Sequence, residues 1–163
     1  MSLQSIINTL EKLVMIHDSL LSISEQKTKA IKEGNTDSLQ PLIVKESKHI
    51  QALEQVEAIR QKEVKNWFET NNLQTEDHTI TRMLEKTVDN EKQKAVAEVI
   101  TRLTKVVTDL KQQEQLNKSL IQQSLQFVEL SIDMMNPSIS NLNYGNKKET
   151  ESSLKRSVFD SKA

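Results

Sequence analysis

The sequence predicts an all-α protein, in which an antiparallel helical hairpin and one long third helix form a coiled-coil-like three-helix bundle with a flexible C-terminal tail. The 163 residues include only 2 glycines and 2 prolines, which are too few for the turns of a sheet protein. Aromatic residues make up 3%, although strands favour aromatic and β-branched side chains. Apolar residues instead recur at steps of three and four, the spacing of one helix face.

The first helix is predicted from apolar side chains that share one face near the N-terminus. These positions are Leu3, Ile6, Leu10, Leu13 or Val14, His17, Leu20 or Leu21, and Ala30 or Ile31. The segment KEGNTDS, residues 32–38, should end this helix, because Gly34 can adopt the left-handed conformation found after a helix C-terminus. Asn35, Thr36 or Asp37 can then cap the next helix by accepting hydrogen bonds from its free N–H groups.

The second helix is predicted over a similar length, about 30 residues or ~45 Å. Its apolar positions are Leu39, Leu42 or Ile43, Ile50, Leu53, Val56, Ile59, Val64, and Trp67 or Phe68. Pro41 lies in the first turn or just beyond it, so a cap at Ser38 would make it harmless and a cap at Thr36 would predict a slight kink. The polar segment TNNLQTEDHT, residues 70–79, ends the pattern.

A short helix is predicted next, with Ile80, Met83, Leu84 and Val88 directed inward. Asp89 or Asn90 can cap a long third helix, unless the two helices are continuous. The seam of the long helix runs through Val96, Val99, Leu103, Val106, Leu110, Gln113, Asn117 and Leu120. Two of these positions, Gln113 and Asn117, are polar, which indicates that they set the register of the bundle or face solvent.

The expected domain organisation is a helical bundle of residues 1–136 followed by a flexible polar tail of residues 137–163. Pro137 should end the long helix, because proline cannot continue the hydrogen-bond ladder. The tail is rich in Ser, Asn and Lys and has too few large apolar residues to fold alone. Leu154, Val158 and Phe159 form a small apolar island near its end.

The end of the long helix is more apolar than its beginning. At ~45 residues the helix would be roughly 65–70 Å long, so its last ten to fifteen residues should extend past the hairpin. Two apolar stripes are expected there, one of Leu120, Phe127, Leu130 and Met134, and the other of Ile121, Leu125, Val128, Ile132 and Met135. Ser124 and Ser131 lie where the earlier seam continues.

So wide an apolar arc needs more partner surface than one face of a hairpin provides. An external amphipathic helix could supply it, since Leu, Met and Phe suit such a groove. The short helix near Ile80, or a second copy of the chain, could cover the same residues instead.

The composition argues against several classes of function. The net charge of -1 disfavours a strongly electrostatic nucleic-acid or membrane-surface binder, and no apolar run reaches the ~20 residues that span a bilayer. The chain has no cysteine, and only one Glu-x-x-His motif, Glu46 and His49, where di-iron bundles need two. We therefore expect no enzyme activity, no metal, no cofactor and a cytoplasmic location.

Three stretches resemble the FlgN family of cytoplasmic export chaperones for flagellar hook-associated proteins. Residues 27–61 resemble its helical hairpin, with a Gly-Asn turn and an E-x-x-R motif at Glu57 and Arg60. Residues 113–135 resemble its N-x-x-L-x-x-x-S-L segment, which is matched here by Asn117, Leu120, Ser124 and Leu125. The ending SVFDSKA, residues 157–163, is similar to that of Gram-positive members.

The resemblance implies a chaperone that binds the proteins of the hook–filament junction and delivers them to the flagellar type III export gate and its ATPase machinery, without ATP or metal of its own. In the family the late third helix and C-terminal region bind the terminal segment of the client. The implied client-binding residues are Leu120, Ile121, Leu125, Phe127, Val128, Leu130, Ile132, Met134 and Met135. Tyr144 is a candidate contact with the export gate, and Val158 and Phe159 are candidates for covering the empty groove.

Two other readings use the same apolar end of the long helix. A structural coiled-coil protein would use it to form a homodimer or larger oligomer. A helical adaptor or regulator of signalling would use the tail as its recognition motif. Sedimentation and capture of hook-associated proteins distinguish these functions from the export chaperone.

Overall fold

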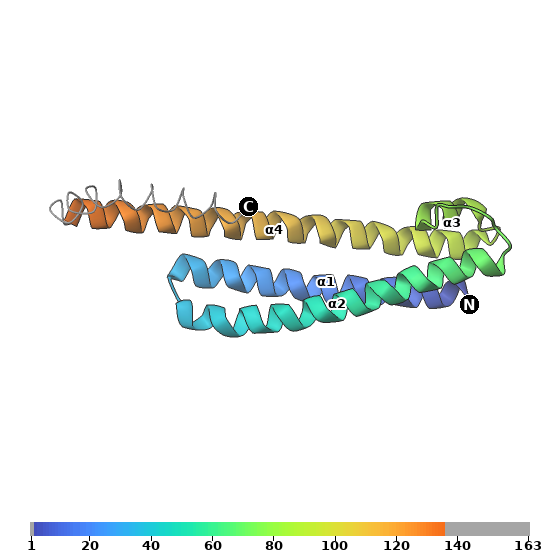
Figure 1. The fold of residues 1–163 in the computed structure, drawn as a ribbon, viewed down its shortest axis with the longest axis horizontal. Helices are drawn as coiled ribbons and strands as arrows, with labels where there is room; N and C mark the ends of the chain where they lie inside the picture. Colours follow the sequence, from blue (N-terminus) through green and yellow to red (C-terminus); the bar gives the residue numbers. More distant parts are fainter. Residues whose placement is uncertain (1, 136–163) are drawn as a thin grey trace, which may run out of the picture. The chain divides into compact units, whose positions relative to one another are not determined.

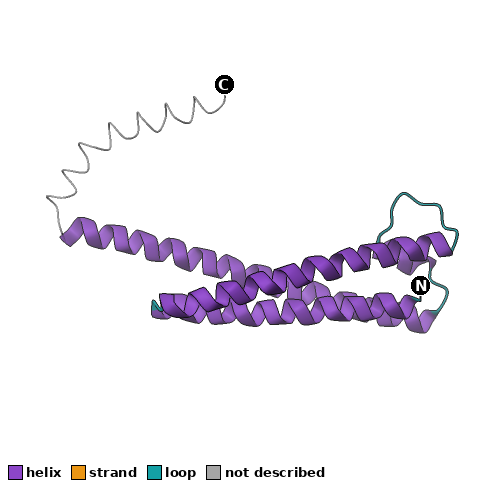
Figure 2. Cartoon of the chain, turned by 60° about the horizontal axis from the view of Figure 1, so that its bottom comes forward, coloured by secondary structure: helices purple, strands orange, loops and turns teal. Residues whose placement is uncertain are grey.

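The protein is seen here in a computed structural model that describes residues 2–135. The described residues form helices α1 (Leu3–Glu33), α2 (Thr36–Thr70), α3 (Ile80–Lys86) and α4 (Asn90–Met135) (Figure 1). Helices and connecting loops account for this whole part of the chain (Figure 2). The prediction of an all-α fold built from long packed helices is confirmed.

The chain divides into two compact units, the first of residues 1–120 and the second from Ile121 onward. The division lies inside α4, whose helical structure continues through it. The predicted boundary between a bundle and a tail, at residues 136 and 137, lies outside the described residues and stays a prediction.

The turn between α1 and α2 is formed by a left-handed glycine, Gly34, and a helix cap, Asn35. Gly34 has φ 64°, a left-handed conformation that side chains with a Cβ rarely adopt. The N–H of Asn35 donates to the carbonyl of Ala30 at 2.9 Å, and the Asn35 side chain accepts from the N–H of Ser38 at 3.2 Å. Asn35 is thus the cap of α2, and Pro41 lies beyond the first helical turn.

The core of the first unit lies where α1, the end of α2, α3 and the beginning of α4 meet. Its most completely buried large side chains are those of Ile6, Leu10, Val64, Phe68, Met83 and Val96. Trp67 and Phe68 pack edge to face with ring centroids 5.2 Å apart. Each such side chain contributes about 1.5–3 kcal/mol when it is fully removed from water, which makes this region the main source of stability.

Burial in α2 is concentrated near its C-terminal end, in residues 63–68. Two positions of the predicted apolar face are half in water, since Ile50 is 41% exposed and Ile59 is 50% exposed. Both lie at the edge of the apolar face, whose centre is occupied by the partly buried Leu53 and Val56.

The prediction that Val88 is directed inward is also wrong, because its side chain is 93% exposed. The chain leaves helical structure after Lys86, where the hydroxyl of Thr87 donates to the carbonyl of Met83. The carboxylate of Asp89 then accepts from the first N–H groups of α4. These contacts make α3 and α4 separate helices, with Val88 between them.

A buried polar layer joins α1 to α4. Asn117 is 3% exposed, and its Nδ2 donates to the carbonyl of Ser24 at 3.0 Å. The hydroxyl of Thr28 lies 2.5 Å from Oδ1 of Asn117 and accepts from Nε2 of Gln113. Polar partners that must meet across an interface allow one alignment of the helices, so the layer sets the register of α4 on α1.

An ionic bridge lies beside this layer and joins three helices. Nζ of Lys27 on α1 lies 2.9 Å from a carboxylate oxygen of Glu46 on α2 and 3.0 Å from one of Glu114 on α4. Burial acts to lower the pKa of Lys27, but hydrogen bonds to Glu46 and Glu114 outweigh it and raise the pKa above 10.5. The bridge therefore favours the charged form of this lysine.

Candidate functional site

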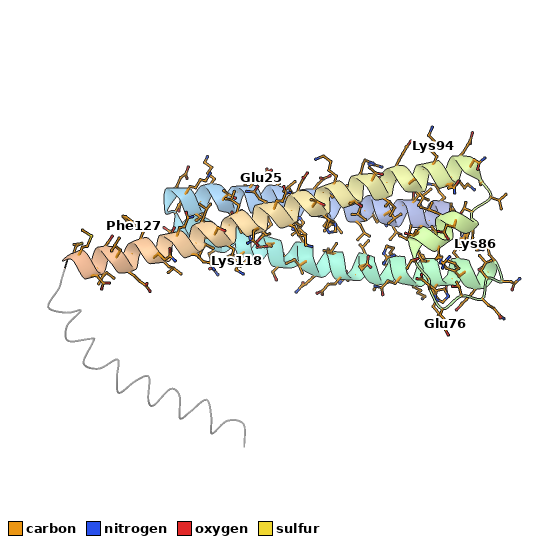
Figure 3. All side chains as sticks on the ribbon, turned by 90° about the horizontal axis from the view of Figure 1, so that it is seen from above. Glu25, Glu76, Lys86, Lys94, Lys118 and Phe127 are labelled. Atoms are coloured by element: carbon orange, nitrogen blue, oxygen red, sulfur yellow. The ribbon has the colours of Figure 1, made fainter. Side chains whose placement is uncertain are left out.

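The last turns of α4, from Ile121 to Met135, expose large apolar side chains. Eight of the nine residues predicted to bind a client are exposed here, with side-chain exposure from 48% at Ile121 to 84% at Met135. They are Ile121, Leu125, Phe127, Val128, Leu130, Ile132, Met134 and Met135. The ninth, Leu120, is half-buried and belongs to the first unit. Figure 3 shows Phe127 on this part of α4.

These residues are helical because their types favour helices and because they continue the packed part of α4. Leu, Gln, Met and Glu favour helices, and the segment contains neither Gly nor Pro. Fifteen residues alone would form only a marginal helix in water, but here they extend a helix that is already nucleated by packing. The hydroxyl of Ser131 donates to the carbonyl of Phe127 at 2.8 Å, so this polar group is satisfied within the helix.

One apolar stripe of this segment continues the buried face of α4. We call it the seam stripe, and it consists of Ile121, Leu125, Val128, Ile132 and Met135. A step of eighteen residues is about five turns, so Met135 lies on the same line of the helix as Asn117, and Val128 on the same line as Leu110. Asn117 is buried and Leu110 half-buried, whereas their counterparts in the seam stripe are exposed.

The other apolar stripe lies on a face that is mostly polar earlier in the helix. We call it the outer stripe, and its exposed residues are Phe127, Leu130 and Met134, whereas Leu120, the fourth residue of the predicted stripe, is half-buried. Eighteen residues before Phe127 is Asp109, which pairs with Lys105 on the surface, and eighteen before Leu130 is Gln112. Eighteen before Met134 is Leu116, an apolar residue that is 42% exposed. The outer stripe is therefore no continuation of the core face, because the same face of the helix is mostly polar upstream and is not buried.

Glu129 and Asp133 are the only charged residues of the exposed segment. They were not among the predicted site residues, although they follow the last basic residue of the helix, Lys118. Neither carboxylate pairs with a cation within the part of the chain that the structure describes. The surface thus combines an apolar arc with a weakly acidic rim.

The Glu57 and Arg60 side chains of the E-x-x-R motif form a two-bond ion pair on α2, at 2.8 and 2.5 Å. Hydrogen bonding from Arg60 holds the pKa of Glu57 below its ordinary value. Both side chains are half-buried, and each satisfies the charge of the other within α2.

The ionisable side chains of the described helices do not assemble a metal centre. No group of three or more His, Asp or Glu residues among them has the geometry to hold an ion. Glu46 bonds to Lys27, whereas Nδ1 of His49 lies 2.8 Å from the carbonyl of Lys45 in its own helix.

Three residues with predicted roles in the tail, Tyr144, Val158 and Phe159, lie outside the described residues. Their roles stay predictions.

Comparison with known proteins finds one protein family and one relative that match almost the whole chain or all of it. The model of the FlgN protein family matches residues 1–152. A protein of Bacillus subtilis (strain 168), described as the uncharacterized protein YvyG, is 36% identical over 165 aligned positions that span 100% of both chains. No solved structure matches the chain.

Proposed function

Because this chain belongs to the FlgN family of flagellar export chaperones, we propose that it binds hook-associated proteins of the hook–filament junction and delivers them to the flagellar type III export apparatus. FlgN is a chaperone family and not an enzyme family. No helix among the described residues is both long and apolar enough to cross a bilayer. The proposed place of action is the cytoplasm, before export.

The observation that carries the proposal is the exposed end of α4. A contiguous set of apolar side chains at helical spacing is typical of a binding site for another amphipathic segment. Each side chain can contribute up to about 1.5–3 kcal/mol if a partner buries it fully. Part of that gain is offset by the entropy lost on association.

The proposed mechanism is shielding by burial. A terminal segment that drives assembly of the hook–filament junction must stay unassembled in the cell, and its apolar face would otherwise promote aggregation. Packing that face on the seam stripe and outer stripe removes both surfaces from water. Release at the export apparatus then requires only that a competing contact replace the chaperone, with no ATP or metal bound by this chain.

We propose two further roles for the tail from its sequence. Tyr144 is a candidate contact with the export gate, where an aromatic side chain would bind a mixed polar and apolar surface. Val158 and Phe159 are candidates for covering the α4 surface when no client is present.

Capture of hook-associated proteins by the purified full-length chain tests the proposal. The double variant Leu125→Glu/Val128→Glu should not capture them, because two carboxylates would have to be buried against the client. The double variant Gln122→Glu/Gln126→Glu, on the polar side of the same helix, is the matched control and should still capture them. Equal capture by both double variants would contradict the proposed site.

The same exposed surface also favours a second function, that of a structural coiled-coil oligomer. Sedimentation at several concentrations separates the two. A stable homodimer that buries Leu125 and Val128 and does not exchange with hook-associated proteins would replace the chaperone function with an oligomeric one.

A further inference from the structure

The apolar arc at the end of α4 is too wide for one partner helix. At 3.6 residues per turn, the seam stripe and the outer stripe are centred on directions that differ by roughly 140°, and together they occupy an arc of about 220°. A helix that packs along another helix covers an apolar stripe of about 100°. One bound helix would therefore leave the side chains of one stripe in water.

Small residues separate the two stripes. Ser124 and Ser131 lie between them on the side where the arc is continuous. The seam stripe lies in line with the face that binds α1 upstream, since Met135 follows Asn117 by about five turns. The outer stripe has no buried counterpart, because its line passes through Asp109, Gln112 and Leu116, the last of which is 42% exposed.

The charges indicate what kind of partner fits. Glu129 and Asp133 are unpaired within the described residues and adjoin the apolar arc. A second copy of the segment would bring its own two carboxylates to the same interface without a basic residue to oppose them. A partner with Lys or Arg beside its apolar face is complementary to this surface.

We infer that the client segment consists of two amphipathic helices, one packed on the seam stripe and one on the outer stripe, with basic residues that face Glu129 and Asp133. The inference rests on the proposed chaperone function and specifies the form of its client. It accounts for both stripes, because a single bound helix would leave the side chains of one of them in water.

The test measures the affinity of the full-length chain for terminal fragments of the hook-associated proteins by calorimetry. The fragment that binds is shortened from either end, about one helical turn at a time. Three variants are compared with the parent chain: Val128→Asn in the seam stripe, Phe127→Asn in the outer stripe, and Gln126→Asn on the polar side as the control. Circular dichroism verifies that each variant remains helical.

With the intact fragment, Val128→Asn and Phe127→Asn should each raise Kd by roughly tenfold or more, and Gln126→Asn by less than about twofold. Shortening the fragment from one end should remove the effect of one stripe variant and retain the effect of the other. This pattern is expected only when separate client helices contact the two stripes.

Other results would overturn the inference and leave the chaperone function standing. One is a minimal fragment whose affinity is lowered equally by both variants. Another is an affinity that Phe127→Asn does not change. A third is tighter binding by Phe127→Asn, which would mean that the chain's own residues cover the outer stripe. A change in sedimentation without a change in affinity would assign it to a second copy. Failure of every fragment and of the intact proteins to bind the parent chain would contradict the proposed function itself.

Discussion

The two parts of α4 share one apolar face and differ in what covers it. In the first part Val96 is fully buried and Val99 is 3% exposed, and both share a core with α1, α2 and α3. In the second part no large apolar side chain from Ile121 to Met135 is less than 48% exposed. The comparison teaches that helical periodicity identifies an apolar face, whereas the available partner determines whether that face stabilises the fold or remains free for binding.

The largest expected effect is a difference in the free energy of unfolding between Leu→Ala in the core and Leu→Ala at the end of α4. Leu10→Ala removes a side chain that is fully buried, so it should lower the free energy of unfolding by about 2–5 kcal/mol. Leu125→Ala removes one that is 61% exposed and should change it by less than about 0.5 kcal/mol. Urea denaturation followed by circular dichroism measures both, and a comparable loss in the two variants would show that Leu125 is buried in solution.

A smaller effect is expected for polar side chains in the two parts of α4. Asn117→Ala should cost about 1–3 kcal/mol, because it removes the buried hydrogen bonds that Asn117 makes to Ser24 and Thr28. Ser131→Ala should be neutral or slightly stabilising, since its hydroxyl only bonds a carbonyl of its own helix. Thermal or urea unfolding checks the pair, and a neutral Asn117→Ala would mean that the polar layer does not set the register.

The smallest effect concerns the ionic bridge at Lys27. Its pKa is raised in the folded protein, so the bridge contributes fully below the ordinary lysine pKa of 10.5 and is lost as pH rises through the folded value. The stability difference between the parent and Lys27→Met, less than about 1 kcal/mol, should therefore shrink above a pH of about 10.5. A difference that grows with pH, measured by urea unfolding, would contradict this assignment.

Much of the fold follows from local signals in the sequence. Gly34 and Asn35 determine the turn of the hairpin because a left-handed residue and a side-chain cap are properties of one or two positions. The seam of α4 is also local, since Val96, Val99 and Val106 recur at helical spacing and are all buried. The exposed end was expected for a similar reason, because helix lengths follow from residue counts.

Other features depend on contacts between distant residues and have no local signal. Glu63 is buried because Ser5 and Thr9 donate hydrogen bonds to its carboxylate, and nothing near Glu63 in the sequence indicates those partners. Val88 fits the apolar spacing of its neighbours, yet the caps at Thr87 and Asp89 turn it into solvent. Asn117 and Gln113 marked the polar layer, but their partners on α1 became evident only in three dimensions.

The central claim is that the end of α4 is accessible in the free protein and covered by a client. Because the chain contains no cysteine, a single thiol introduced as Val128→Cys can be labelled selectively. Met15→Cys, on an exposed position of α1, is the matched control. The account predicts fast labelling of both thiols in the free protein and strong protection of position 128 alone when a hook-associated protein is bound. Slow labelling of Val128→Cys in the free protein, or no protection in a complex that has been shown to form, would contradict it.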